Sequence, residues 1–255
     1  MKEQVKHRLR IRFGLRFLLI CILACALVCA WFARQLSEGR RHQQIAVKLQ
    51  AIGCDIGFSH RKEVPMANPP AWLLVGGGIP YEEISTLPGF LERTGLALAV
   101  RRVSRVAIRS RSDMSASLEL VKELGSVDTL SFGDTGVTQP QLADTMNSIR
   151  LRSVYLKSES LPRTRIRWLN HAGLTWLCVK RTQFSNPAIE DLPQSLEYFD
   201  ATRTRINDDG LSSFVRLANL TSLDLRRTPT SKNAIEVLRT QMPWCKIKWE
   251  PLVQP

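Results

Sequence analysis

Residues 220–228 read Leu-Thr-Ser-Leu-Asp-Leu-Arg-Arg-Thr, and residues 196–204 read Leu-Glu-Tyr-Phe-Asp-Ala-Thr-Arg-Thr. The same pattern recurs down the C-terminal part of the chain at steps of 22 to 24 residues. A fixed period of this length is typical of a stacked solenoid, in which each repeat contacts only its neighbours. The seven copies begin at Val103, Val127, Leu151, Leu174, Leu196, Leu220 and Trp244.

Four columns of apolar residues run through the first six copies. Counted from each start, offsets 0, +3, +5 and +15 are apolar in every copy, although hydrophobic residues make up only 44% of the chain. Offsets +3 and +5 alternate, so they point to one face of a short strand. Offsets +15 and +18 are three apart, so they share one face of a short helix. Each repeat is therefore predicted to contain a strand and a helix that are buried against the neighbouring repeats.

Polar residues at fixed offsets predict the turns. Asn207, Thr138, Ser185 and Ser231 precede the expected helices, at the position where a short polar side chain caps free backbone amides. Offset +8 carries a threonine in four copies, and its hydroxyl is expected to satisfy backbone groups in the turn that leaves the strand. The copy that begins at Leu151 is expected to be less regular, with a distorted turn over residues 161–165. The four threonines are Thr135, Thr182, Thr204 and Thr228.

In these residues the chain resembles leucine-rich-repeat proteins of the cysteine-containing, F-box-protein-like subclass. The likeness is carried by the strand pattern and by the turn at residues 204–211, Thr-Arg-Ile-Asn-Asp-Asp-Gly-Leu. Threonine stands at the position where the subclass often has cysteine or asparagine. The resemblance implies an α/β leucine-rich-repeat solenoid, with a parallel β-sheet on the concave side and short helices on the convex side. The layout is similar to that of bacterial proteins with one N-terminal membrane helix, but a fold alone does not specify function.

The N-terminus combines a basic arm with an apolar segment. Residues 1–16 carry six lysines and arginines against one glutamate, and residues 17–33 are uncharged and apolar. A helix of that length extends about 25 Å, enough to cross the hydrocarbon core of a bilayer. Basic residues before the segment favour a cytoplasmic N-terminus. The expected location is therefore the inner (cytoplasmic) membrane, as a single-pass protein whose C-terminal domain is extracytoplasmic.

Three alternatives for the apolar segment stay open. The first is a retained signal anchor. The second is a cleaved signal peptide, because the residues Val28, Cys29 and Ala30 fit a small-residue cleavage rule. The third is a lipoprotein signal, in which residues 22–25, Ile-Leu-Ala-Cys, would serve as a lipobox. All three alternatives place the C-terminal domain on the same side of the membrane.

The distribution of charge, proline and repeats predicts five sections of chain. These are a basic cytoplasmic arm (1–16), a transmembrane helix (17–33), an adaptor or N-terminal cap (34–102), a leucine-rich-repeat domain of six repeats plus a terminal strand (103–249) and a tail (250–255). Within the adaptor we expect a helix from Glu38 to Ala51 and a short strand over residues 54–58. The apolar stretch 71–75 is the expected cover for the open end of the first repeat.

Strand residues at offsets +2, +4 and +6 are expected to face the concave side. In the middle copies these positions hold aromatic residues with charged residues around them. Exposed aromatic and charged side chains together are a common composition of binding surfaces, although aromatic pairs also simply stabilise neighbouring strands. The hypothesis is a partner-binding surface that consists of Tyr155, Lys157, Trp176, Lys180, Tyr198, Asp200, Asp224 and Arg226.

The sequence contains no motif of catalysis. It lacks a nucleophile–histidine–acid set, a phosphate loop and a zinc-ligand spacing, so we expect neither an enzyme nor a cofactor. The net charge of +13 favours anionic partners, but no nucleic-acid recognition motif is present and no nucleic acid is expected. The expected function is a membrane-anchored, non-catalytic scaffold that binds a protein through its concave face. The alternative is a binder of envelope polymer or acidic glycan through the same face.

Overall fold

The computed structural model describes residues 15–65, 81–109, 112–133, 135–157, 166–170 and 173–252. The fold is mixed α/β and is built on an eight-stranded sheet in the order β1-β4-β5-β6-β7-β8-β9-β10. From β4 to β10 neighbouring strands are parallel and lie in chain order, as stacked repeats require. These strands are β4 (Val103–Arg109), β5 (Ser126–Gly133), β6 (Arg150–Lys157), β7 (Trp176–Cys178), β8 (Tyr198–Asp200), β9 (Ser222–Asp224) and β10 (Lys246–Lys248).

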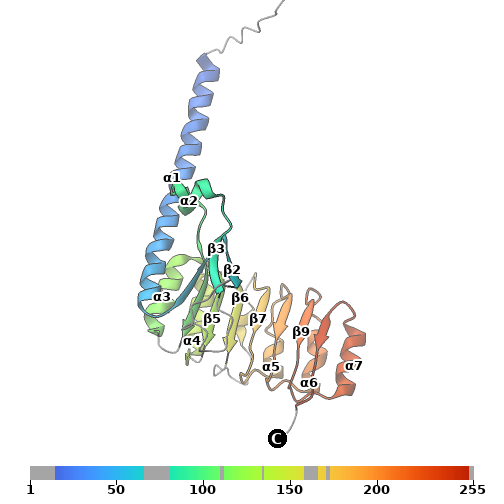
Figure 1. The fold of residues 1–255 in the computed structure, drawn as a ribbon. Coiled ribbons are helices and arrows are strands. Elements are labelled where there is room, and N and C mark those ends of the chain that lie inside the picture. Colours follow the sequence, from blue (N-terminus) through green and yellow to red (C-terminus); the bar gives the residue numbers. More distant parts are fainter. Residues whose placement is uncertain are drawn as a thin grey trace, which may run out of the picture.

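A helical element follows each of the strands β4 to β9. Figure 1 shows these elements along one side of the sheet, and we call the opposite side the open face. The helices become short single turns in the middle of the array and lengthen again at its end. They are α3 (Met114–Leu124), α4 (Gln139–Ser148), the 3₁₀ turn η3 (Arg167–Leu169), α5 (Asn186–Ile189), α6 (Asp208–Leu211) with the 3₁₀ turn η4 (Ser212–Phe214), and α7 (Lys232–Gln241).

The core lies between the sheet and these helices, and it consists of the predicted apolar columns. All 24 positions at offsets 0, +3, +5 and +15 are buried. Phe184, Phe199 and Phe214 are completely buried and contact one another, with ring centroids 5.4 and 5.8 Å apart. The prediction of a continuous core shared by neighbouring repeats is therefore confirmed.

The predicted turn chemistry is also present. Thr138, Ser185, Asn207 and Ser231 are the N-cap residues of α4, α5, α6 and α7. The Asn207 side chain does not accept a hydrogen bond from a backbone amide of α6, and the Asn207 backbone amide donates to Oδ1 of Asn186 in the preceding repeat at 3.1 Å. The hydroxyls of the offset +8 threonines donate to backbone carbonyls at 2.7–2.8 Å, from Thr182 to Val179, from Thr204 to Ala201 and from Thr228 to Leu225.

One continuous helix, α1 (Leu15–Ala51), contains 37 residues and includes both the apolar segment 17–33 and the predicted adaptor helix. Its N-terminal part projects away from the rest of the structure with its apolar side chains exposed (Figure 1). Its C-terminal part packs on the first repeat, where Ile45, Ala46 and Leu49 are buried in the core. Within the described residues, α1 is the one helix long and apolar enough to cross a membrane.

The start of the sheet is covered by α1 and by β1 (Asp55–Phe58), which is the predicted strand and pairs with β4 in the antiparallel direction. Arg102 fastens α1 to β4, since its guanidinium donates to the carbonyl and side-chain oxygens of Gln35 at 3.1 and 2.7 Å. A second, two-stranded sheet consists of β2 (Arg61–Pro65) and β3 (Tyr81–Ser85), and it is followed by α2 (Gly89–Arg93) and the 3₁₀ turn η2 (Leu96–Ala99). The predicted cover at 71–75 and the distorted turn at 161–165 lie outside the described residues.

Candidate functional site

The predicted aromatic residues are brought together on the open face of the sheet. The register of the parallel strands places Trp176 of β7 beside Tyr198 of β8 and beside Ser153 of β6. Tyr155 lies two residues further along β6, opposite Cys178, and is therefore diagonal to the tryptophan. We call Tyr155, Trp176 and Tyr198 the aromatic patch.

The rings of the aromatic patch are stacked. The ring centroids of Trp176 and Tyr198 are 3.7 Å apart with an interplanar angle of 16°, and those of Tyr155 and Trp176 are 6.4 Å apart at 29°. The tryptophan remains 36% exposed, and both tyrosines are half-buried. Burial raises the pKa of both tyrosine hydroxyls, so they stay protonated near neutral pH. The patch therefore presents neutral aromatic surface with hydroxyl groups that donate hydrogen bonds.

The acidic residues beside the patch are held by the fold itself. Asp200 accepts hydrogen bonds from the backbone amide and hydroxyl of Thr202, at 2.9 and 2.6 Å. The Asp224 carboxylate accepts from the Nε of Arg226 at 2.9 and 3.1 Å and lies 3.2 Å from the Thr202 hydroxyl. Burial opposes ionisation of Asp224, but hydrogen bonds and charge from Arg226 prevail and hold its pKa below the usual value.

Asp224 thus differs from the expectation drawn from its offset. It lies on the predicted face, but it is only 1% exposed, so it is wrong to count it among exposed flanking charges. Its negative charge is neutralised by Arg226, whose side chain is 39% exposed. Thr202 was not among the predicted site residues, although its place two residues after one aspartate indicated that it could bond the backbone locally.

The basic residues of the hypothesis lie at the carboxyl ends of the strands. Lys180 follows β7, and with Arg226 and Glu250 it lines a shallow hollow of about 210 Å³. Lys157 is the last residue of β6, where its backbone pairs with Gly133 of β5, and its side chain is outside the described part of the structure. The structure therefore assembles the aromatic patch with a basic edge on one side of it.

Cys178 lies between Tyr155 and Asp200 in the register of the strands and is nearly buried, at 9% exposure. Its Sγ donates to Oδ2 of Asp200 at 3.8 Å. Burial, reinforced by the neighbouring carboxylate, raises the pKa of this thiol to about 11. Cys178 is therefore protonated near neutral pH and is not an activated nucleophile.

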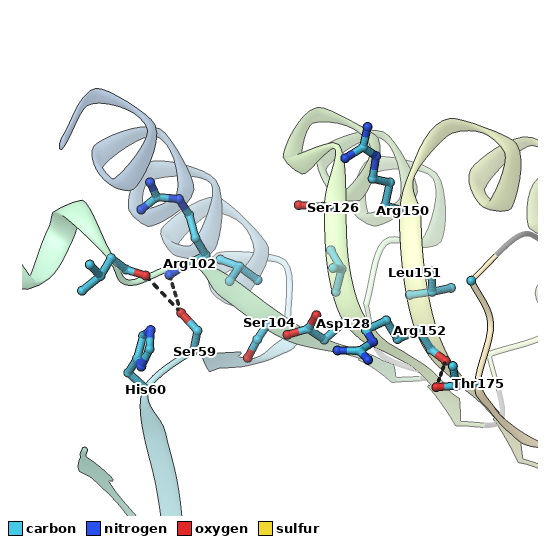
Figure 2. Close-up of a pocket in the computed structure, with 14 residues that line it drawn as sticks. Ser59, His60, Arg102, Ser104, Ser126, Asp128, Arg150, Leu151, Arg152 and Thr175 are labelled. Atoms are coloured by element: carbon cyan, nitrogen blue, oxygen red, sulfur yellow. Dashed lines mark hydrogen bonds between the residues drawn. The ribbon is translucent and has the colours of Figure 1, made fainter. Parts of the chain in front are cut away.

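A second hollow lies at the amino ends of the strands, between β1, β4, β5 and β6 (Figure 2). It measures about 830 Å³ and its lining includes Ser59, His60 and Asp128. These three do not form a catalytic set, because the Ser59 hydroxyl donates to the Val100 carbonyl at 3.4 Å and accepts from the Arg102 amide at 2.8 Å. In the view of Figure 2, Ser104 lies between His60 and the Asp128 carboxylate.

Metal ligation finds no support in the described part of the chain. No three histidine, cysteine, aspartate or glutamate side chains gather there in a group that could hold a metal ion.

Comparison with known proteins gives little beyond this geometry. No family model and no curated protein matches the chain. Among solved structures, the chain is similar to an internalin from Listeria monocytogenes, with 19% sequence identity and a TM-score of 0.37. The match covers 52% of this chain and 46% of the internalin, so this chain matches less than half of that protein's length. The fold is leucine-rich-repeat-like, and that assignment rests on the buried repeat columns and the parallel strands in chain order.

Proposed function

We propose that this protein is a membrane-anchored, extracytoplasmic leucine-rich-repeat protein that acts as a non-catalytic scaffold and binds a protein partner through the concave, open face of its sheet. The observation that carries the proposal is the aromatic patch, which is a stacked and partly exposed cluster on a surface that no described helix covers. The five sections predicted from the sequence are kept as the proposed domain organisation. Membership of the cysteine-containing, F-box-like subclass is part of the proposal, and threonine in place of cysteine or asparagine at the ladder position departs from that subclass.

The anchor is proposed to be the N-terminal part of α1, retained after synthesis. Large apolar side chains along it, from Phe17 to Trp31, are 50–64% exposed. Exposure of so much contiguous apolar surface to water is unfavourable, which supports a membrane environment for this segment. The helix α1 continues without a break into the core of the first repeat. Its packed part begins at Ile45, so cleavage near Ala30 or lipidation at Cys25 would leave that part in place. The continuous helix would hold the repeat domain in a fixed orientation to the bilayer.

The protein-binding role is tested by removing the two stacked rings. We expect the double variant Trp176→Ala, Tyr198→Ala to lose partners captured by crosslinking in intact cells, because buried aromatic anchors contribute about 2 kcal/mol or more each to an interface. The matched control is Trp244→Ala, which removes a tryptophan that is 47% exposed at the far end of the array. Unchanged capture by the double variant, or equal loss in the control, would reject the concave face as the binding surface.

The proposed sidedness is tested with a thiol reporter. Ser212→Cys places a thiol at an exposed turn on the helical side. Burial raises the pKa of the native thiols Cys178 and Cys245 to about 11, so at pH 7 their thiolate fraction is roughly 100-fold smaller than at a pKa of 9. In cells whose outer membrane has been made permeable, we expect a membrane-impermeant maleimide to label the Ser212→Cys variant quickly. The parent chain should be labelled only slowly. Labelling of the variant only after lysis of the inner membrane would place the repeat domain in the cytoplasm and reject the proposed topology.

The alternative function, binding of envelope polymer or acidic glycan by the same face, draws on the partly exposed aromatic patch and on Lys180 and Arg226 at the carboxyl ends of the strands. Basic side chains pair with acidic groups of such a polymer. The two functions differ in one outcome, since glycan-degrading treatment of cell envelopes would release a glycan binder and leave a protein binder retained.

A further inference from the structure

A row of three arginines follows the strands at the carboxyl edge of the sheet. Arg181, Arg203 and Arg227 occupy the same offset, +7, in three consecutive repeats. All three have a left-handed backbone, with φ of 59°, 57° and 56°. We call them the arginine row. The first three repeats carry Ser110, Asp134 and Ser158 at this offset, and these lie outside the described residues.

Backbone hydrogen bonds fix the arginine row in register. The amide of Arg181 donates to the Thr202 carbonyl at 3.0 Å, and the amide of Arg203 donates to the Arg226 carbonyl at 3.0 Å. The amide of Arg227 continues the series to the carbonyl of Glu250 at 2.9 Å. The three residues are therefore held about one strand spacing apart, roughly 4.8 Å.

Nothing within the fold accounts for arginine at these positions. A left-handed backbone is adopted most readily by glycine and asparagine, and a longer side chain there is strained. Three like charges on adjacent strands also repel one another. All three side chains are exposed, and none forms a hydrogen bond or ion pair within the described chain. Both effects would favour asparagine, so a ligand is the simplest reason for the arginines.

The arginine row lines a hollow of about 830 Å³. Arg205 adds a fourth guanidinium, Gln183 adds an amide, and none of the lining residues is acidic. A guanidinium presents planar paired donors that match the two oxygens of a carboxylate or phosphate group. A hollow with four such groups at short intervals matches a ligand with several negative charges along its length.

The position of the hollow favours a ligand other than the bilayer. The C-terminal end of α1 lies near the carboxyl end of β4, because Asp55, which follows α1, pairs with Ala107. Residues nearer the apolar half of α1 lie at the amino end of β4, where Arg102 donates to Gln35. The carboxyl ends of the strands are thus remote from the apolar half of α1.

The geometry points to a binding site for a linear anionic polymer, with carboxylate or phosphate groups along its chain, laid across the three turns of the arginine row. The site does not include the aromatic patch, but the arginine row also borders the smaller hollow that is lined by Lys180, Arg226 and Glu250. Only the exclusion of the bilayer rests on the proposed membrane anchor.

The test uses the full chain in neutral detergent micelles and fluorescent polymers. The probes are polygalacturonate for carboxylates, polyphosphate for phosphates and poly-glutamate for an acidic protein segment, with neutral dextran as a blank. We expect the triple variant Arg181→Asn, Arg203→Asn, Arg227→Asn to bind one or both of the first two polymers at least about tenfold more weakly. Its melting temperature should not fall, since asparagine accepts the left-handed backbone. The more strongly bound polymer identifies the charged group.

The matched control removes three positive charges elsewhere, through Arg150→Gln, Arg152→Gln and Lys232→Gln. These residues are exposed and lie outside the hollow, so binding should stay within about twofold of the parent chain. Equal weakening in both triple variants would show attraction by net charge alone and overturn the site. Preferred, arginine-dependent binding of poly-glutamate would overturn the assignment to a non-protein polymer. The Trp176→Ala, Tyr198→Ala variant should bind the polymer normally, whether or not its protein partner is lost.

Discussion

Phe199→Ala is expected to lower the free energy of unfolding by about 3–5 kcal/mol, the range for removal of a large buried aromatic side chain. Phe199 is completely buried in the fifth repeat and lies between Phe184 and Phe214, with ring centroids 5.4 and 5.8 Å away. Because each repeat is stabilised by its neighbours, the cavity should also weaken the coupling between the two halves of the array. Urea denaturation in micelles, followed by tryptophan fluorescence, measures both the midpoint and the sharpness of the transition.

The control for this prediction is Phe90→Ala, the same substitution at a phenylalanine that is 62% exposed in α2. Its effect should stay within about 0.5 kcal/mol. A comparable loss in the two variants, or a loss below about 1 kcal/mol at Phe199, would contradict a core shared between neighbouring repeats.

Gly39→Val is expected to destabilise the junction between α1 and the repeats by about 1–3 kcal/mol or more. A Cβ at Gly39 would overlap the carbonyl oxygen of Leu98, and that oxygen belongs to the backbone of η2, which cannot rotate away. Displacement of this turn would also disturb Arg102, because the Arg102 guanidinium donates to the Leu98 carbonyl at 3.0 Å and to Gln35 of α1. The midpoint of urea denaturation should fall, and trypsin should cut faster at Arg101.

Gly89→Ala is the matched control, because a Cβ at Gly89 meets no atom within 4 Å. Gly89 begins α2, so alanine there should be neutral or slightly stabilising. Trypsin sensitivity that is unchanged in the Gly39→Val variant would show that α1 does not depend on close contact with η2. Taken with the exposed N-terminal part of α1, this contact makes the proposed anchor and the repeats one continuous unit.

The repeat pattern correctly predicted the core of the repeat domain and the starts of four helices. Its apolar columns are buried at all 24 positions, and the four predicted N-caps lie at helix starts. This succeeded because the period of the sequence and the period of the structure are the same, so each column has the same neighbours in every repeat. The stacking of Trp176 on Tyr198 followed from the same register.

The predictions that failed or fell short depended on contacts between segments. The offset of Asp224 indicated its face, but its burial follows from the ion pair with Arg226 and from Thr202 one repeat away. The sequence predicted two helices, 17–33 and 38–51, which the structure joins into the single helix α1. The contacts of this helix with the repeat domain, at Gly39 and Leu49, involve residues far away along the chain and could not be read from local composition.

By itself, the sequence determined a stack of short parallel strands and helices, the residues that form its core, and an apolar N-terminal segment, because local periodicity and composition are sufficient for these features. Only the tertiary structure decided which polar side chains are engaged within the fold and which are free to bind. Asp200 and Asp224 are held by their neighbours, whereas the arginine row stands exposed at the edge of the sheet. The physical reason is that solvation and charge pairing depend on groups from adjacent repeats, which are more than 20 residues away along the chain.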